Sequence, residues 1–100
     1  MRTNWWDSFN TPVVPYAILL RHFIDGSMTG DEFAIIFFRI WPNLPTTLSP
    51  AISKVLHSFF WDVENYCGDD ELRGEGDIDE ETFRERARTA FEKLLLLRPS

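Results

Sequence analysis

The sequence predicts an all-α protein, a small four-helix bundle with an acidic loop between its third and fourth helices. In four segments, apolar residues recur at the three- and four-residue spacing of a helix face. Capping residues or proline precede these segments, and glycine or proline follows them. A chain of 100 residues, 44% of them hydrophobic, fits one domain over 1–100 with a single core.

The first predicted helix begins at Pro15 and ends before Gly26, because proline suits the first turn of a helix and glycine its end. Its apolar face comprises Tyr16, Leu19, Leu20, Phe23 and Ile24. Residues 1–14 are too short and interrupted for a helix prediction. They include Trp5 and Trp6, so we expect an aromatic arm that packs on the core.

The second predicted helix has two start signals. Thr29 and Glu32 have the spacing of a capping box, and Met28 and Phe33 that of a hydrophobic staple. Pro42 ends the helix. Its apolar face comprises Phe33, Ile36, Phe37, Ile40 and Trp41.

The third and fourth predicted helices also begin with capping residues. Ser49 caps the third, which runs from Pro50 to about Tyr66, and Asp79 caps the fourth. The apolar faces comprise Ile52, Val55, Leu56, Phe59, Val63 and Tyr66 in the third helix, and Phe83, Ala87, Ala90, Phe91 and Leu94 in the fourth. Arg84, Arg86 and Arg88 are expected on a solvated face, with Glu81–Arg84 and Glu85–Arg88 pairs.

Residues 61–81 contain ten of the sixteen acidic residues and a single basic one, Arg73, which gives this stretch a net charge of −9. The whole chain carries only −6, so negative charge is concentrated here. Such a field attracts a cationic partner and accelerates association. Trp61, Tyr66 and Leu72 are interspersed among the acids and have the character of interface anchors.

Several function classes receive no support. The acidic balance argues against nucleic acid as the partner. No nucleophile and base, phosphate loop or dinucleotide motif is present, so we expect neither catalysis nor a cofactor. Cys67 is the only cysteine and no signal peptide or membrane span is visible, so we expect a cytoplasmic protein without a membrane partner, monomeric or weakly dimeric when free.

Two alternatives remain open for the acidic stretch. It could be a solvated loop of an adaptor or structural bundle that docks another basic protein. It could also be a calcium-binding helix-loop-helix, because Asp69, Gly74 and Glu80 occupy positions one, six and twelve of such a loop. Arg73 at position five counts against calcium, since it replaces a ligand with a positive charge.

The sequence resembles the colicin D-type immunity proteins of bacteria. The resemblance covers about residues 16–95 and is carried by the order and spacing of segments 16–26, 29–33, 55–66, 70–73 and 79–81. It implies a small helical bundle that binds a cognate basic nuclease toxin, typically one that cuts transfer RNA. The acidic side chains of the bundle would then cover the toxin's catalytic cleft in place of RNA phosphates.

By position, the resemblance implies partner-binding roles for Asp62, Glu64, Tyr66, Asp69, Asp70, Glu71, Asp77 and Asp79. Trp61 and Leu72 join them as candidate apolar anchors. Two departures from the family pattern stand out: the first fifteen residues fall outside it, and Glu64 stands where an aspartate is expected. The identity of the toxin does not carry over.

Overall fold

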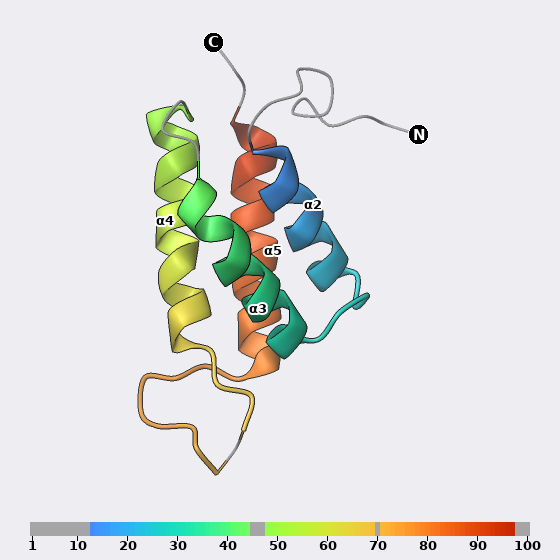
Figure 1. The fold of residues 1–100 in the computed structure, drawn as a ribbon, viewed down its shortest axis with the longest axis vertical. Coiled ribbons are helices and arrows are strands. Elements are labelled where there is room, and N and C mark those ends of the chain that lie inside the picture. The colour runs from blue at the N-terminus through green and yellow to red at the C-terminus, as the bar shows by residue number, and fades with distance from the viewer. Residues whose placement is uncertain (1–12, 45–47, 70, 98–100) are drawn as a thin grey trace.

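The computed structural model describes residues 13–44, 48–69 and 71–97. This part of the chain forms four α-helices, which confirms the predicted all-α fold. They are α2 (Val14–Ile24), α3 (Gly30–Ile40), α4 (Pro50–Asn65) and α5 (Glu80–Leu96). Figure 1 shows α2 and α4 on either side of α5, with α3 across the front, and successive helices running in opposite directions.

The predicted caps form where the sequence placed them. The Thr29 side chain accepts a hydrogen bond from the Glu32 N–H at 3.1 Å, and Glu32 accepts one from the Thr29 N–H at 2.8 Å, which completes the capping box. Ser49 accepts from the Ile52 N–H at 3.3 Å to begin α4. Pro42 lies in a single 3₁₀ turn, Trp41–Asn43, that follows α3 directly.

Aromatic side chains from all four helices meet at the centre of the core. The Phe83 ring on α5 lies 4.9 Å from Phe23 on α2, 5.4 Å from Phe33 on α3 and 5.9 Å from Phe59 on α4, centroid to centroid. Phe83 is fully buried. Because α5 packs against the other three helices, this one side chain connects the whole bundle.

The prediction that Ile36 lies on the buried face is wrong, since 39% of its surface is exposed. Only Gly30, Phe33 and Phe37 of α3 are buried, a stripe narrower than the apolar pattern suggested. Two further apolar residues of α3, Ile35 and Phe38, are also exposed. The helix lies across the outside of the bundle, so one narrow face is enough to attach it (Figure 1).

Arg84 is not the solvated residue that the charge pattern predicted. Its guanidinium lies 4.7 Å from the centre of the Phe23 ring and donates to the carbonyls of Phe23 (3.0 Å) and Met28 (3.3 Å). Its ion-pair partner is Glu80 at 3.7 Å, where Glu81 was expected. Arg84 therefore adds a cationic donor to carbonyls at and beyond the C-terminal end of α2, where the helix dipole favours positive charge.

The other predicted ion pair, Glu85–Arg88, is confirmed at 2.6 Å. The start of α2 at Val14 falls one residue before the predicted start, and Val13 is already fully buried. The aromatic arm was predicted for 1–14, and Trp5 and Trp6 lie outside the described residues.

Candidate functional site

Residues 66–79 connect α4 to α5 at the end of the bundle where α3 begins (Figure 1). We call this connection the acidic loop. Hydrogen bonds hold its two ends together. The Cys67 N–H donates to the Ile78 carbonyl at 2.9 Å, and the Ile78 N–H donates to the Asn65 carbonyl at 2.8 Å. Arg73 Nε donates to the Cys67 carbonyl at 3.0 Å. The base of the loop is thus closed by its own backbone.

Three predicted carboxylates, Asp69, Glu71 and Asp77, are exposed on this loop. Asp69 accepts a hydrogen bond from the Glu71 N–H at 2.9 Å, and Asp77 accepts one from the Gly74 N–H at 3.0 Å. Each of these two carboxylates has further lone pairs that face solvent. Asp70, the fourth predicted loop carboxylate, lies outside the described residues.

Asp79 is the cap of α5. It accepts a hydrogen bond from the Thr82 N–H at 2.8 Å, which lowers the pKa of its carboxyl group. A lowered pKa means that the ionised cap stabilises the fold above the usual aspartate range and that this contribution is lost as the pH falls through the lowered value. The predicted binding residue therefore has a structural task as well.

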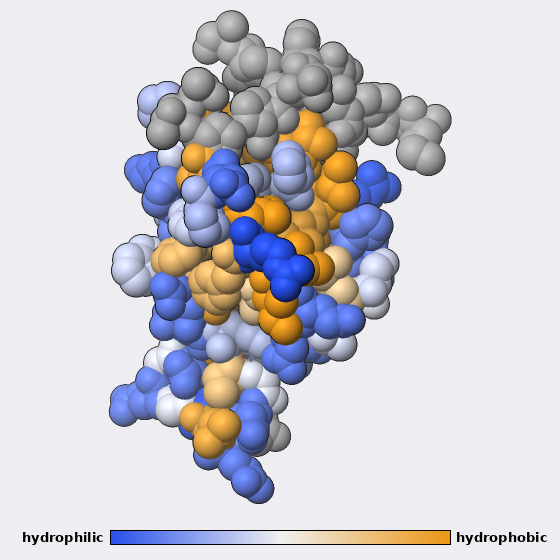
Figure 2. All heavy atoms as spheres, in the orientation of Figure 1, coloured by the Kyte–Doolittle hydropathy of each residue, from blue (hydrophilic) through white to orange (hydrophobic). Residues whose placement is uncertain are grey.

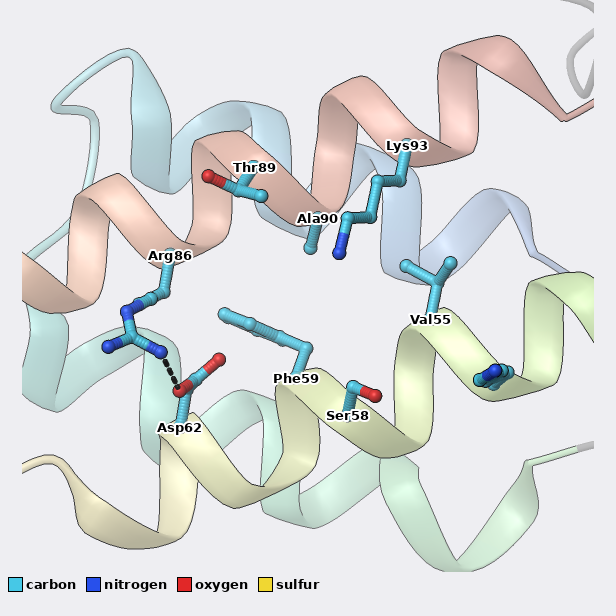
Figure 3. A pocket seen from close by; sticks show the side chains of 9 residues that line it. Val55, Ser58, Phe59, Asp62, Arg86, Thr89, Ala90 and Lys93 are labelled. Carbon is cyan, nitrogen blue, oxygen red and sulfur yellow. Dashed lines mark hydrogen bonds and ion pairs between the residues drawn. The ribbon is translucent and has the colours of Figure 1, made fainter.

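Asp62 and Glu64 point to different sides of α4. Asp62 lines a groove of about 410 Å³ between α4 and α5, where its carboxylate lies 3.2 Å from Nη1 of Arg86 (Figure 3). Lys54 and Lys93 line the same groove. Glu64 lines another groove, between α3 and α4. The structure does not bring these two predicted partner-binding carboxylates together.

We expect Asp62→Asn to gain stability relative to the wild type as the pH rises from about 4 to 7. Burial raises the pKa of Asp62, although the charges of Arg86 and Lys93 oppose this. A raised carboxyl pKa contributes stability below the unfolded-state pKa that is lost as the pH rises through the folded value. Asparagine stays neutral and avoids this loss.

Urea unfolding of the wild type and Asp62→Asn at both pH values measures the difference in unfolding free energy. Ser58→Ala is the control, because Ser58 lines the same groove and has no side chain that titrates in this range. A constant difference between Asp62→Asn and the wild type across this range would contradict the prediction.

Tyr66 makes most of its contacts inside the molecule. Its ring stacks on Phe83 with centroids 4.6 Å apart, and its hydroxyl is hydrogen-bonded to the Asp31 carboxylate. Burial first, then this hydrogen bond and the negative charges of Asp31 and Glu80, raise the pKa of Tyr66 above its usual value. Tyr66 therefore attaches the start of the loop to α3 and α5.

The beginning of α3 leaves room only for glycine beside this tyrosine. A Cβ atom at Gly30 would lie 2.7 Å from Cζ of Tyr66. The backbone N–H of Gly30 donates a hydrogen bond to Glu80 Oε1 at 2.6 Å. Sequence reasoning missed Asp31 and Glu80 as members of this site. The usable signal was the alternation of helix direction, which places the start of α3 next to the end of α4.

The two predicted apolar anchors are both solvent-exposed, Trp61 to 65% and Leu72 to 75%. Trp61 contacts Phe60 with ring centroids 5.9 Å apart, and Phe60 in turn contacts Phe38 of α3 at 5.9 Å. Figure 2 shows apolar surface over α3 and again at the lower end of the molecule, among hydrophilic residues. Apolar side chains are therefore exposed among hydrophilic residues on this face of the molecule.

Within residues 13–44, 48–69 and 71–97, no group of three or more His, Cys, Asp or Glu side chains is placed to bind a metal ion. In the same part of the chain, no helix is both long and apolar enough to cross a lipid bilayer.

Comparison with known families matches residues 12–94 to the family described as bacterial self-protective colicin-like immunity. The match includes the acidic loop, the start of α3 and most of α5. Comparison with curated proteins gave no match, and neither did comparison with solved structures.

Proposed function

Since the chain belongs to the family of colicin-like bacterial immunity proteins, which protect a cell from a toxin, we propose that its target is a cognate nuclease. The acidic loop would occupy the basic active-site cleft of that nuclease in place of RNA. We further propose that the toxin cuts transfer RNA, as the resemblance to D-type members implies. The immunity protein itself contributes no catalytic step.

The observation that carries this proposal is the position of the exposed carboxylates. Asp69, Glu71 and Asp77 lie on one loop whose base is closed by backbone hydrogen bonds. A nuclease cleft presents Lys and Arg side chains to phosphate groups, and carboxylates can satisfy those cations without offering a bond to cleave. The loop is suited to compete with RNA for such a cleft.

Charge alone does not account for tight binding, because buried ion pairs roughly break even once both groups lose water. Interfaces obtain affinity from apolar and aromatic side chains near their centre. Trp61, in α4, and Leu72, on the acidic loop, are both exposed and are suited to that role. We propose that carboxylates direct the encounter while these side chains slow dissociation.

Co-expression tests the proposal directly. The chain is produced in bacteria together with the C-terminal domain of a candidate colicin-like toxin, and survival is compared with cells that produce the toxin alone. We expect the chain to restore growth and, as a purified protein at equimolar amount, to block cleavage of transfer RNA. An active toxin that kills equally with and without the chain would refute immunity toward it.

Restored growth against a toxin that cuts no RNA would leave immunity in place and refute the nuclease assignment. A second measurement addresses the site of action. If the chain binds the toxin but leaves RNA cleavage unchanged in the purified system, occupation of the catalytic cleft is refuted.

A further inference from the structure

A groove of about 620 Å³ lies between α3 and α4, open to solvent. Its apolar lining comes mainly from α3, with Ala34, Ile35 and Phe38, and Val63 of α4 completes it. Ile35 is 61% exposed and Phe38 40% exposed. Exposed apolar residues gathered in one place on a small protein are typical of an interaction surface.

The charged residues that line this groove all have the same sign. They are Asp31 from α3, Glu64 from α4 and Asp69 from the acidic loop. Among the described residues that line it there is no Lys, Arg or His. The groove between α4 and α5 is different, since Lys54, Arg86 and Lys93 line it. The α3–α4 groove is therefore complementary to a cation, and the α4–α5 groove is not.

Two of the three carboxylates of the α3–α4 groove, Asp31 and Asp69, are held by hydrogen bonds. The Tyr66 hydroxyl hydrogen-bonds Asp31, and the Tyr66 ring is itself stacked on the core residue Phe83. Asp69 accepts a hydrogen bond from the Glu71 N–H at 2.9 Å. On the apolar side, Phe38 packs edge-on against Phe60 with centroids 5.9 Å apart. A site organised before binding loses less conformational entropy when it is occupied.

We propose that this groove binds an arginine side chain of the partner that is flanked by apolar residues. The apolar stem of the arginine would lie against Ile35 and Ala34, and its guanidinium would reach Glu64 and Asp69. Arginine suits the groove better than lysine, because the guanidinium is planar, pairs with carboxylates through two hydrogen bonds and stacks on aromatic rings such as Phe38. This inference rests on the proposed function in taking the nuclease toxin as the source of the arginine.

Ile35→Lys places a competing cation in the groove and tests the proposal in the complex. Binding of the purified candidate toxin domain is measured by calorimetry. We expect the Kd to rise by roughly 10–100-fold, the size of effect typical of an interface hot spot. The matched control is Leu96→Lys, because Leu96 is 82% exposed at the opposite end of the bundle and is expected to leave Kd unchanged. Circular dichroism melts establish that both variants stay folded.

A titration with short peptides tests the groove without the toxin. The probe is acetyl-Leu-Arg-Leu-amide, and the control peptide replaces arginine by citrulline, which has nearly the same shape but no charge. We expect the arginine peptide to bind at roughly millimolar concentration and to shift amide resonances of 31–38 and 63–69 in the ¹⁵N-labelled protein. The citrulline peptide should leave those resonances in place.

The outcomes separate this inference from the proposed function. If the wild type binds the toxin and Ile35→Lys binds as tightly as Leu96→Lys does, the groove proposal is overturned while immunity stands. If the wild type does not bind that toxin, the proposed function fails for it, and the peptide titration alone decides the inference. Shifts spread over other surfaces, equal shifts with citrulline, or no shifts at all would each overturn it.

Discussion

Phe83→Ala is expected to reduce the free energy of unfolding by ~3–5 kcal/mol, the usual cost of removing a buried phenylalanine ring. Phe83 contacts Phe23, Phe33 and Phe59, so its loss opens a cavity between residues of all four helices. A domain of this size has a total stability of roughly 5–15 kcal/mol, so this loss is a large fraction of it. Urea unfolding followed by circular dichroism measures the change.

Two further variants make this result specific. Phe83→Leu keeps much of the side-chain volume. Apart from the effect of the lost ring contacts, we expect it to reduce the free energy of unfolding by less than about 1.5 kcal/mol. Phe38→Ala removes the same ring from a site that is 40% exposed and is expected to cost roughly 1 kcal/mol. If Phe83→Ala were no more destabilising than Phe38→Ala, Phe83 would not be the residue that joins the helices.

Neutralising three loop carboxylates together, Asp69→Asn, Glu71→Gln and Asp77→Asn, is expected to slow association with the toxin by roughly 10–100-fold at low salt. Long-range attraction between a carboxylate-rich loop and a basic cleft raises the encounter rate, and salt screens it. The salt dependence of the association rate should therefore become flatter. Stopped-flow fluorescence at several salt concentrations measures both effects.

The control for this experiment changes net charge by the same amount elsewhere. Asp25→Asn, Glu85→Gln and Glu92→Gln remove three exposed carboxylates that lie outside the acidic loop. We expect this variant to associate nearly as fast as the wild type. Equal slowing by both triple variants would mean that total charge matters and that the position of the loop carboxylates does not.

The helices could be predicted from sequence because their signals are local. Thr29 and Glu32 are three residues apart, and the capping box they form sets where α3 begins whatever packs around it. Burial on α3 was less predictable. Ile36 has the spacing of a core residue, yet it is 39% exposed because only one side of α3 contacts the other helices. Spacing identifies an apolar face, and packing decides how much of it is covered.

The candidate site was predictable in part. The sequence identified the loop carboxylates, which are neighbours along the chain. It did not separate Asp62 from Glu64, although residues two apart on a helix do not face the same way. It also could not identify the contact of Tyr66 with Asp31, because 35 positions separate them and only the arrangement of the helices brings them together. Long-range contacts of this kind require the fold.

The hydrogen bonds from Cys67 to Ile78 and from Ile78 to Asn65 form the base of the acidic loop and do not involve its outer residues. Of the described side chains between 69 and 77, Arg73 also bonds to the Cys67 carbonyl, while Asp69 and Asp77 bond to backbone N–H groups within the loop. If the loop binds the toxin as proposed, the outer carboxylates that contact the toxin differ from the backbone groups that close the loop. On the proposed function, a graft of the loop's outer segment between relatives is expected to change which toxin is neutralised while the scaffold is kept.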